Sequence, residues 1–200
     1  MSANPQVISP EQYLEIDRAA QFRSEYYNGR MYAMSGGSFP HAVLIPNLAR
    51  RLGNALEGRP CVVATTELRV RISPGGLYTY PDLVVICGEP RFADGLENDA
   101  KDTLLNPTVI IEVLSPSTEA YDRGWKFLQY RKIDSLREYV LVSQTEARIE
   151  VFRRQNSGDW LLSETEGMGA VCKLESLDCA IALAEVYDKV TFPENAGFRP

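Results

Sequence analysis

The chain has 200 residues, 44% of them hydrophobic, and its 27 acidic and 21 basic residues give a formal net charge of −6. A chain of this length buries about 70% of the surface that its unfolded form exposes, so it needs no disulfide or metal to stabilise a core. The acidic balance argues against a protein that coats nucleic acid or anionic lipid non-specifically. No apolar run approaches the roughly 20 residues of a membrane span, so we expect one compact domain over residues 1–200 and no membrane partner.

The first residues and the cysteines indicate where such a protein works. Residues 1–6 lack the basic-then-apolar arrangement of a secretion signal, so we expect a cytoplasmic protein. Its four cysteines include no Cys-x-x-Cys pair, and only one histidine is present to help hold a metal. Three of them, Cys61, Cys87 and Cys172, have apolar neighbours. The simplest interpretation of the cysteines is reduced, buried thiols.

Two local signals organise the N-terminal segment. The run Ser9-Pro10-Glu11-Gln12 is typical of a helix start, because it offers a hydroxyl cap, a proline at the first helical position and a glutamine for a capping box. This helix should end near Ala19. Asn28-Gly29 is the strongest two-residue hairpin signal, and it lies between candidate strands at 23–27 and 30–34.

The middle of the chain predicts one helix and several strands. Apolar residues at helical spacing indicate a helix within 38–56 that either begins near Pro46 or is kinked there. Apolar, β-branched stretches predict strands at residues 61–72, 80–87, 107–114 and 138–142. Gly75-Gly76 suggests a hairpin between the first two strands, and a long polar insertion follows at 88–106.

The second half of the chain mixes helix and strand. Residues 115–118 offer hydroxyl caps to a helix over about 119–133. Because this helix separates two apolar strands, we expect a right-handed crossover with parallel pairing. Further elements are predicted as strands at 147–154, 159–163 and 170–174 and a helix near 183–188. The order indicates a mixed α/β (α+β) fold.

Two acids interrupt apolar predicted strands, Asp82 directly after Pro81 and Glu112 within 109–114. Acids are depleted in strands, and burying an ionised carboxylate is costly unless a cation or several donors compensate. If the strands are neighbours, both carboxylates could converge on one divalent cation. Taken singly, each acid would more simply face solvent or pair with an arginine. A two-carboxylate glycosidase also fits the pair, but both tryptophans lie far from these acids in sequence.

The predicted helix over 119–133 carries Asp122, Lys126 and Gln129 on one face, at spacings of four and three. The lysine could place its ammonium near a metal-bound water or a scissile phosphate and offset charge that develops there. The simpler alternative is an exposed ion pair between Asp122 and Lys126. A third candidate acid, Glu25, shares a face of the first hairpin with Tyr27.

His41, the only histidine, lies near the start of its helix. It could hydrogen-bond a phosphate or a catalytic carboxylate, or it could be structural. The sequence contains neither a Gly-x-Ser-x-Gly nucleophile elbow nor a Gly-x-x-x-x-Gly-Lys-[Ser/Thr] phosphate loop.

Several of these motifs together resemble the Uma-type endonuclease family, which belongs to the PD-(D/E)xK, or restriction-endonuclease-like, superfamily. The resemblance spans about residues 9–189. It rests on Pro81-Asp82, the run 112–118, Asp122-Arg123-x-x-Lys126 with Tyr130, the run 138–142, the hairpin at 25–31 and His41. It implies a central mixed sheet flanked by helices and a Mg²⁺-dependent (or Mn²⁺-dependent) phosphodiester hydrolase site.

The resemblance also implies roles for individual residues. Asp82 and Glu112 would bind the metal, with Glu25 and the backbone carbonyl of Val113 as further ligands. The superfamily's lysine normally stands two places after the second acid, where this chain has Leu114. Lys126 would then substitute for it, with support from Gln129.

The leading hypothesis is a cytoplasmic, Mg²⁺-dependent DNA endonuclease, and the superfamily suggests a homodimer. The rival hypothesis is a catalytically silent domain that binds nucleic acid or a protein through the same surface. Residues 155–200 carry eight acids and three bases, so most of the acidity lies outside the candidate site. Arg69, Arg71 and Arg123 are candidate phosphate contacts.

Overall fold

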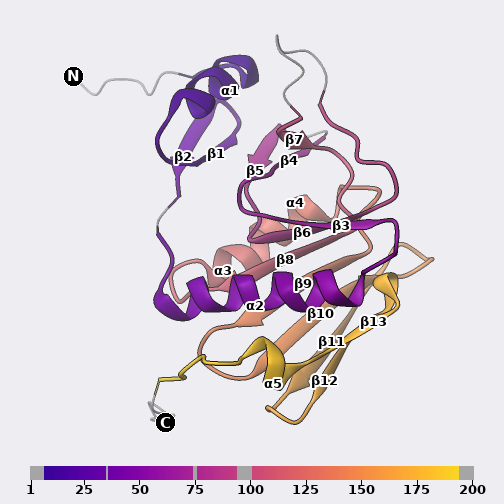
Figure 1. Ribbon diagram of the computed structural model, residues 1–200. Helices are drawn as coiled ribbons and strands as arrows, with labels where there is room; N and C mark the ends of the chain where they lie inside the picture. The colour runs from indigo at the N-terminus through magenta and orange to yellow at the C-terminus, as the bar shows by residue number, and fades with distance from the viewer. Residues whose placement is uncertain (1–6, 35, 74–75, 94–100, 194–200) are drawn as a thin grey trace.

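The computed structural model describes residues 7–34, 36–73, 76–93 and 101–193. Within these residues a six-stranded sheet forms the centre, in the order β11-β10-β9-β8-β6-β3 (Figure 1). Its strands are β3 (Cys61–Thr65), β6 (Leu83–Cys87), β8 (Val109–Leu114), β9 (Glu138–Ser143), β10 (Arg148–Arg154) and β11 (Trp160–Glu166). Pairing is antiparallel except between β8 and β9, which confirms the predicted parallel pair.

A second, five-stranded sheet has the order β2-β1-β5-β4-β7. Its strands are β1 (Ser24–Tyr27), β2 (Arg30–Ala33), β4 (Arg69–Ile72), β5 (Leu77–Thr79) and β7 (Thr103–Leu104). The β1–β2 hairpin turns at Asn28 and Gly29, whose φ angles of +48° and +81° satisfy the predicted turn. Helix α1 (Pro10–Ala19) begins with the predicted capping box between Ser9 and Gln12 and ends where predicted, and it packs on this sheet.

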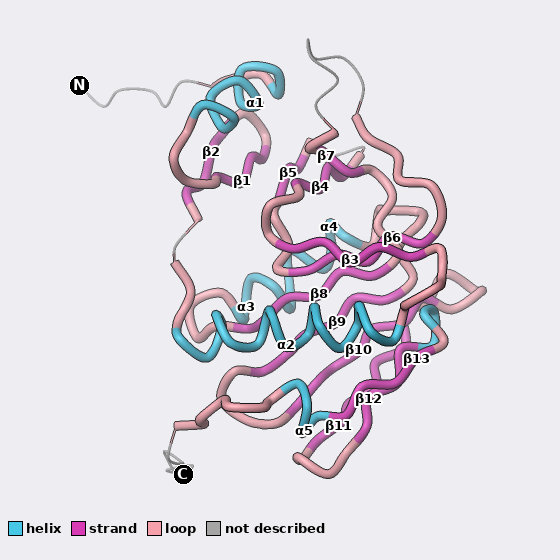
Figure 2. The backbone as a smooth tube through the Cα atoms, viewed as in Figure 1, coloured by secondary structure: helices cyan, strands magenta, loops and turns pink. Residues whose placement is uncertain are grey.

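Helices cover both faces of the six-stranded sheet. Helix α2 (Phe39–Ala55) lies across one face, as Figure 2 shows, and buries Leu44, Leu48 and Leu52 against it. The connection from β8 to β9 covers the other face and consists of α3 (Glu119–Tyr121), the π-helical turn η1 (Asp122–Lys126) and α4 (Phe127–Tyr130). The remaining elements pack beside α2: β12 (Val171–Leu174), the 3₁₀ turn η2 (Glu175–Leu177), β13 (Cys179–Ala182) and α5 (Leu183–Val186). None of the helices in the described ranges has the length and apolar character needed to cross a membrane.

The predicted strand at 61–72 is wrong as a single element. The chain turns at residues 66–68 and divides it into β3 and β4, which belong to different sheets. The residues on both sides of this turn have similar strand-like patterns, so periodicity alone did not reveal that the strand is interrupted. The hairpin expected between the strands at 61–72 and 80–87 has another partner, because β4 pairs with β5, a strand that was not predicted, and β6 lies in the six-stranded sheet. Residues 74–75 lie outside the described residues. The helix does not begin at Pro46, because α2 runs through this exposed proline from Ser38, its N-cap.

The interpretation of the cysteines as reduced thiols is wrong for Cys61 and Cys87, which form a disulfide. They stand directly opposite each other in the β3–β6 pair, with Cα atoms 4.1 Å apart. Strand register creates this proximity, which a separation of 26 residues does not reveal. Cys172 and Cys179 are free, and the first of them is buried as expected.

A buried ion pair ties α1 to the five-stranded sheet. Asp17 is fully buried and accepts hydrogen bonds from Arg69 at 2.7 Å, from the Ser24 N–H at 2.9 Å and from the Tyr80 hydroxyl. Arg69 is only 2% exposed and also donates to Thr103. The predicted role of Arg69 as a phosphate contact is therefore wrong, because its guanidinium is buried and paired with Asp17.

The Asp17→Ala substitution should strongly destabilise the fold, since it leaves the Arg69 charge buried without its partner. We expect a loss of about 3–5 kcal/mol in the free energy of unfolding, measured by urea denaturation. Arg18→Ala is the matched control, because it breaks the partly exposed pair with Asp102 and should cost less than about 1 kcal/mol. Equal losses in the two variants would contradict this account.

Candidate active site

The sheet brings Asp82 and Glu112 together. Leu83 of β6 pairs with Ile111 of β8, so the residue just before β6 lies beside the next residue of β8. The Asp82 N–H donates to Glu112 Oε2 at 3.3 Å, and the Val113 N–H donates to Asp82 Oδ2 at 2.8 Å. Both acids are buried, with exposed fractions of 8% and 4%. The alternative of two solvent-facing acids is therefore wrong.

Lys126 lies on the connection between β8 and β9 and contacts Glu112 from there. Its Nζ lies 2.9 Å from Glu112 Oε1, 3.3 Å from Glu25 Oε1 and 3.5 Å from Asp122 Oδ1. Lys126 and Asp122 are both buried, so the alternative of an exposed ion pair between them is also wrong. Leu114, at the usual lysine position of the superfamily, lies in an apolar cluster instead.

The lysine stands on a π-helical turn rather than on the regular helix that the sequence predicts. The turn η1 includes Asp122, Gly124 and Lys126, and it interrupts the helical connection between α3 and α4. Such single π turns are rare and occur frequently at functional sites. The local geometry thus places both charged side chains inward, where a surface helix would expose them.

Glu25 and His41 complete the cluster from two other elements. Glu25 on β1 accepts hydrogen bonds from the hydroxyls of Thr79 and of Tyr121, the latter at 3.2 Å. His41, in the first turn of α2, has its Nε2 3.2 Å from Asp82 Oδ2. The structure therefore brings together five residues singled out in the sequence with Asp82: Glu25, His41, Glu112, Asp122 and Lys126.

The electrostatics of the cluster are those of a site with excess negative charge. Burial raises the pKa of Glu112 to about 8, with Lys126 opposing this shift and the charges of Asp82 and Asp122 adding to it. Burial alone would lower the pKa of Lys126, but the surrounding acids, Glu112 above all, hold it well above its usual value. The lysine therefore stays charged, and the acids around it outnumber the cations. Perturbed groups of this kind are concentrated at functional sites.

Tyr130 is a site residue to which the sequence analysis gave no role. Its hydroxyl donates to Glu112 Oε1 at 2.8 Å, so it fixes the orientation of this carboxylate. The available signal was its position four residues after Lys126, on the same helical face. Gln129, the predicted support, is buried but accepts a hydrogen bond from Lys132 at 2.6 Å. The contacts of the described residues do not join it to the acids.

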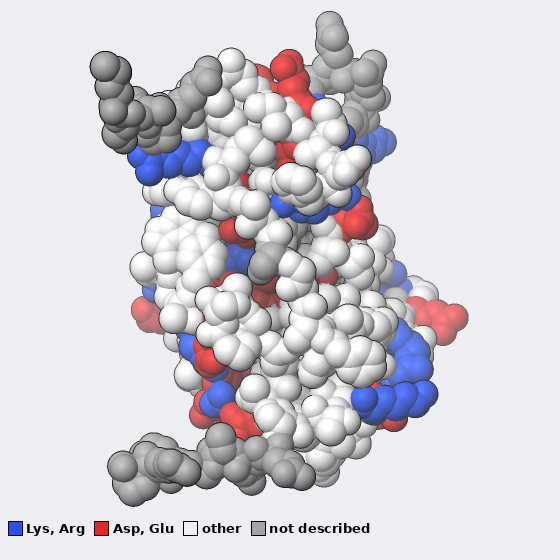
Figure 3. Space-filling model, turned by 90° about the vertical axis from the view of Figure 1, so that its left-hand side faces the viewer, with Lys and Arg blue, Asp and Glu red and all other residues white. Residues whose placement is uncertain are grey.

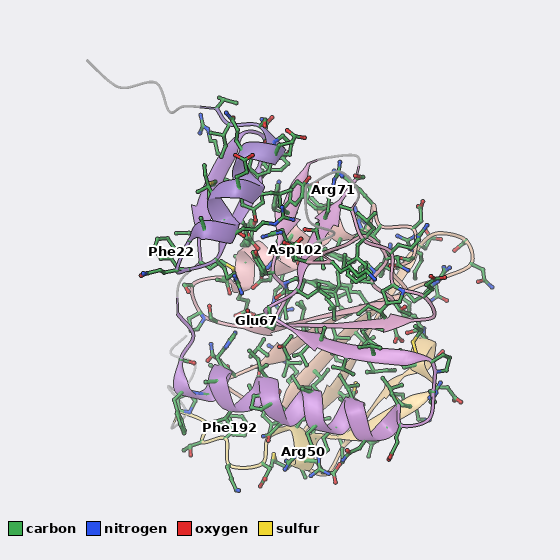
Figure 4. The ribbon with its side chains drawn as sticks, turned by 45° about the horizontal axis from the view of Figure 1, so that its top comes forward. Phe22, Arg50, Glu67, Arg71, Asp102 and Phe192 are labelled. Atoms are coloured by element: carbon green, nitrogen blue, oxygen red, sulfur yellow. A yellow bond between two sulfur atoms is a disulfide. The ribbon has the colours of Figure 1, made fainter. Side chains whose placement is uncertain are left out.

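Two of the three candidate phosphate contacts, Arg69 and Arg123, are already paired with acids. Arg123 pairs with Glu119 at 2.7 Å and with the buried Glu150, so its charge is already neutralised and its predicted role is wrong. Arg71 lies over the ring of Tyr78 on the five-stranded sheet, in the part of the molecule shown at the top of Figure 4.

The donor set suits a hard divalent cation. Asp82, Glu112 and Glu25 supply carboxylate oxygens, and Mg²⁺ commonly binds one or two carboxylates together with water and substrate phosphate. Across the described ranges, however, no three side chains of His, Cys, Asp or Glu already form a ligand group. Lys126 lies between Glu112 and Glu25, where it offsets part of the charge that a cation would balance.

Comparison with known proteins identifies the family. Residues 10–184 match the model of the Uma2 family, which is described as "Putative restriction endonuclease". The chain belongs to the Uma2 family. Two similar proteins from Synechocystis sp. are each named an uncharacterized protein, slr1290 and sll1609. The first is 36% identical over 92% of this chain and 94% of its own, and the second is 33% identical over 84% and 93%.

A solved structure shows that this Uma2 chain shares its fold with another protein. The crystal structure of "a putative nuclease belonging to DUF820" from Anabaena variabilis superposes with a TM-score of 0.73 over 92% of this chain and 99% of that one. The sequence identity is 17%, so the likeness is one of fold. The expected restriction-endonuclease-like fold, a mixed sheet flanked by helices, is confirmed.

The hydrogen bond that His41 donates to Asp82 should give this histidine an unusual titration in the metal-free protein. This bond raises the pKa of His41 above 6.5 despite the opposing effect of burial. The histidine therefore adds stability that is complete below pH about 6.5 and is lost as the pH rises through the raised pKa. NMR titration of the only histidine should show the raised pKa, and Asp82→Asn should lower it. A native pKa at or below 6.5 would contradict the contact.

Proposed function

We propose that this Uma2 protein is a Mg²⁺-dependent endonuclease, with Mn²⁺ as an alternative metal, that hydrolyses phosphodiester bonds of DNA. The observation that carries the proposal is the buried ammonium of Lys126, 2.9 Å from Glu112 in a cluster that includes Asp82. This arrangement combines oxygen ligands for a metal with a fixed cation for a phosphate. The family description and the shared fold support the same activity.

Asp82 and Glu112 would hold the metal, with Glu25 and the backbone carbonyl of Val113 as further ligands. When bound, the metal supplies Lewis acidity and lowers the pKa of a water molecule. Lys126 would orient the attacking water and offset the negative charge that grows on the phosphate in the transition state. Tyr130 and His41 would position the two metal-binding acids through their hydrogen bonds to Glu112 and Asp82.

A second candidate function is a catalytically silent domain that binds nucleic acid or a protein through this surface. The observation that favours it is Leu114 in the apolar core at the usual lysine position. Binding without turnover in Mg²⁺ or Mn²⁺, unchanged by Lys126→Ala, would support this candidate. Turnover that depends on the lysine would exclude it.

The conservative variants Asp82→Asn and Glu112→Gln should each lower Mg²⁺-stimulated cleavage of plasmid DNA by about 100-fold or more. Each removes one anionic ligand while keeping the shape of the buried side chain. Glu57→Gln is the matched control, because it removes an exposed acid outside the cluster and should leave cleavage unchanged. Cleavage at the wild-type rate in both site variants, with native circular dichroism, would overturn the assignment.

Metal binding and lysine function should be separable. Titration of Mg²⁺ or Mn²⁺ into the purified protein should release or absorb heat that Glu112→Gln abolishes. Lys126→Met should retain this heat, because it removes no carboxylate, yet lose plasmid cleavage. Absence of binding heat in the wild-type protein would count against the metal, and cleavage by Lys126→Met would count against the role of the lysine.

A further inference from the structure

A cavity of about 420 Å³ opens next to the acidic cluster and is lined mainly by aromatic side chains. Its walls come from the β1–β2 hairpin, from β5 and from the connection that carries Lys126. The lining residues are Glu25, Tyr27, Tyr32, Leu77, Tyr121 and Trp125. A concave apolar site with a few polar groups is the usual form of a ligand pocket.

The aromatic rings are arranged as a platform. Tyr121 and Trp125 stack with their centroids 5.3 Å apart at 16°, and Tyr27 meets Trp125 edge-on at 4.8 Å. Tyr32 stands opposite Glu25 in the hairpin and is 51% exposed, and Tyr121 is 38% exposed. These rings therefore retain accessible faces on which a flat ligand can stack.

The cavity and the candidate active site share a wall. Glu25 borders the cavity, and its Oε1 lies 3.3 Å from the ammonium of Lys126. The Tyr121 hydroxyl donates to the other oxygen of Glu25, and the Lys126 ammonium lies 5.9 Å from the Tyr121 ring centre. Figure 3 shows acidic and basic atoms within a hollow on the face where the hairpin meets the rest of the chain.

We infer that this cavity binds an unpaired nucleobase of the strand whose phosphate lies at Asp82, Glu112 and Lys126. The inference rests on the proposed function and specifies its substrate as DNA with at least one unstacked base beside the cleaved bond. A base within a duplex has both faces covered, so it must leave the stack to enter an aromatic pocket. Its sugar and phosphate then remain next to Glu25 and the lysine.

The charge of the protein supports stacking as the source of affinity. Proteins that bind nucleic acid through phosphate contacts depend on accessible lysines and arginines. Here the net charge is −6, Arg69 is buried, and Arg123 is paired with two acids. Stacking on aromatic side chains contributes to binding of single strands and tolerates any base sequence. An aromatic pocket thus supplies affinity that the paired Arg69 and Arg123 do not.

Trp125 provides a direct readout, because it lines the cavity and only Trp160 would add to its fluorescence. The double variant Trp160→Phe, Glu112→Gln in EDTA reports binding without cleavage. A single-stranded DNA of about eight nucleotides should quench Trp125, since this length is within the range bound by single-strand modules. The same sequence as a blunt duplex, and a fully abasic strand of the same length, should bind at least about tenfold more weakly.

Tyr32→Ala in this background should weaken single-strand binding by about tenfold, because it removes one exposed face of the pocket without emptying the core. Phe22→Ala is the matched control, since Phe22 is 66% exposed, is not among the lining residues and lies at the edge of the molecule in Figure 4. Affinity that is unchanged by Tyr32→Ala, or an abasic strand that binds as well as the intact one, would overturn the inference.

Failure of this inference differs from failure of the proposed function. Quenching of Trp125 by single-stranded DNA in a protein that cleaves no DNA would retain the pocket and reject the nuclease. Cleavage of duplex DNA by the wild-type protein, with no quenching of Trp125 by any strand, would retain the nuclease and reject the pocket.

Discussion

The buried ammonium of Lys126 is the contact on which the site depends. It lies within 3.5 Å of oxygens from Glu25, Glu112 and Asp122, all of them largely removed from water. Carboxylates buried this closely would repel one another and lose hydration, and a shared cation is what makes their burial tolerable. The same requirement explains why the connection between β8 and β9 must pack where it does, with its π turn against the sheet.

This electrostatic contact links two sheets that also share a buried apolar cluster. Glu25 belongs to the five-stranded sheet, whereas Glu112 belongs to the six-stranded sheet. Thr79, the last residue of β5 in the five-stranded sheet, donates to Glu25. Its hydroxyl lies 3.4 Å from the Tyr130 hydroxyl, which donates to Glu112. The hairpin is therefore positioned by polar contacts at the site as much as by its apolar packing on α1.

The sequence predicted which residues gather at the site better than it predicted the structure around them. An acid inside an apolar run is conspicuous, and helical spacing alone places Asp122 and Lys126 on one face. The contact between Asp82 and Glu112 was harder to predict from the sequence, because it depends on the pairing and register of β6 and β8. The proposal that Lys126 takes the role of a lysine at position 114 came from the resemblance to a family rather than from periodicity.

Other features could not be predicted because they depend on pairing between distant segments. An arginine that binds phosphate and one that forms a buried ion pair can have the same neighbours in the sequence. Only the packing of α1 against β4, which pairs Arg69 with Asp17, distinguishes the two roles. The disulfide between Cys61 and Cys87 likewise depends on register. The cavity beside Glu25 depends on rings from two distant segments, the β1–β2 hairpin and the connection between β8 and β9.

The spread of the site along the chain has a consequence for biosynthesis. Glu25 is made early, but its cationic partner Lys126 follows 101 residues later, and β9, the parallel neighbour of β8, comes after both. Because domains fold as units during synthesis, the acids can assemble only after most of the chain has left the ribosome. A nascent or truncated chain would therefore expose a group of uncompensated carboxylates, so the assembled cluster exists only in the finished fold.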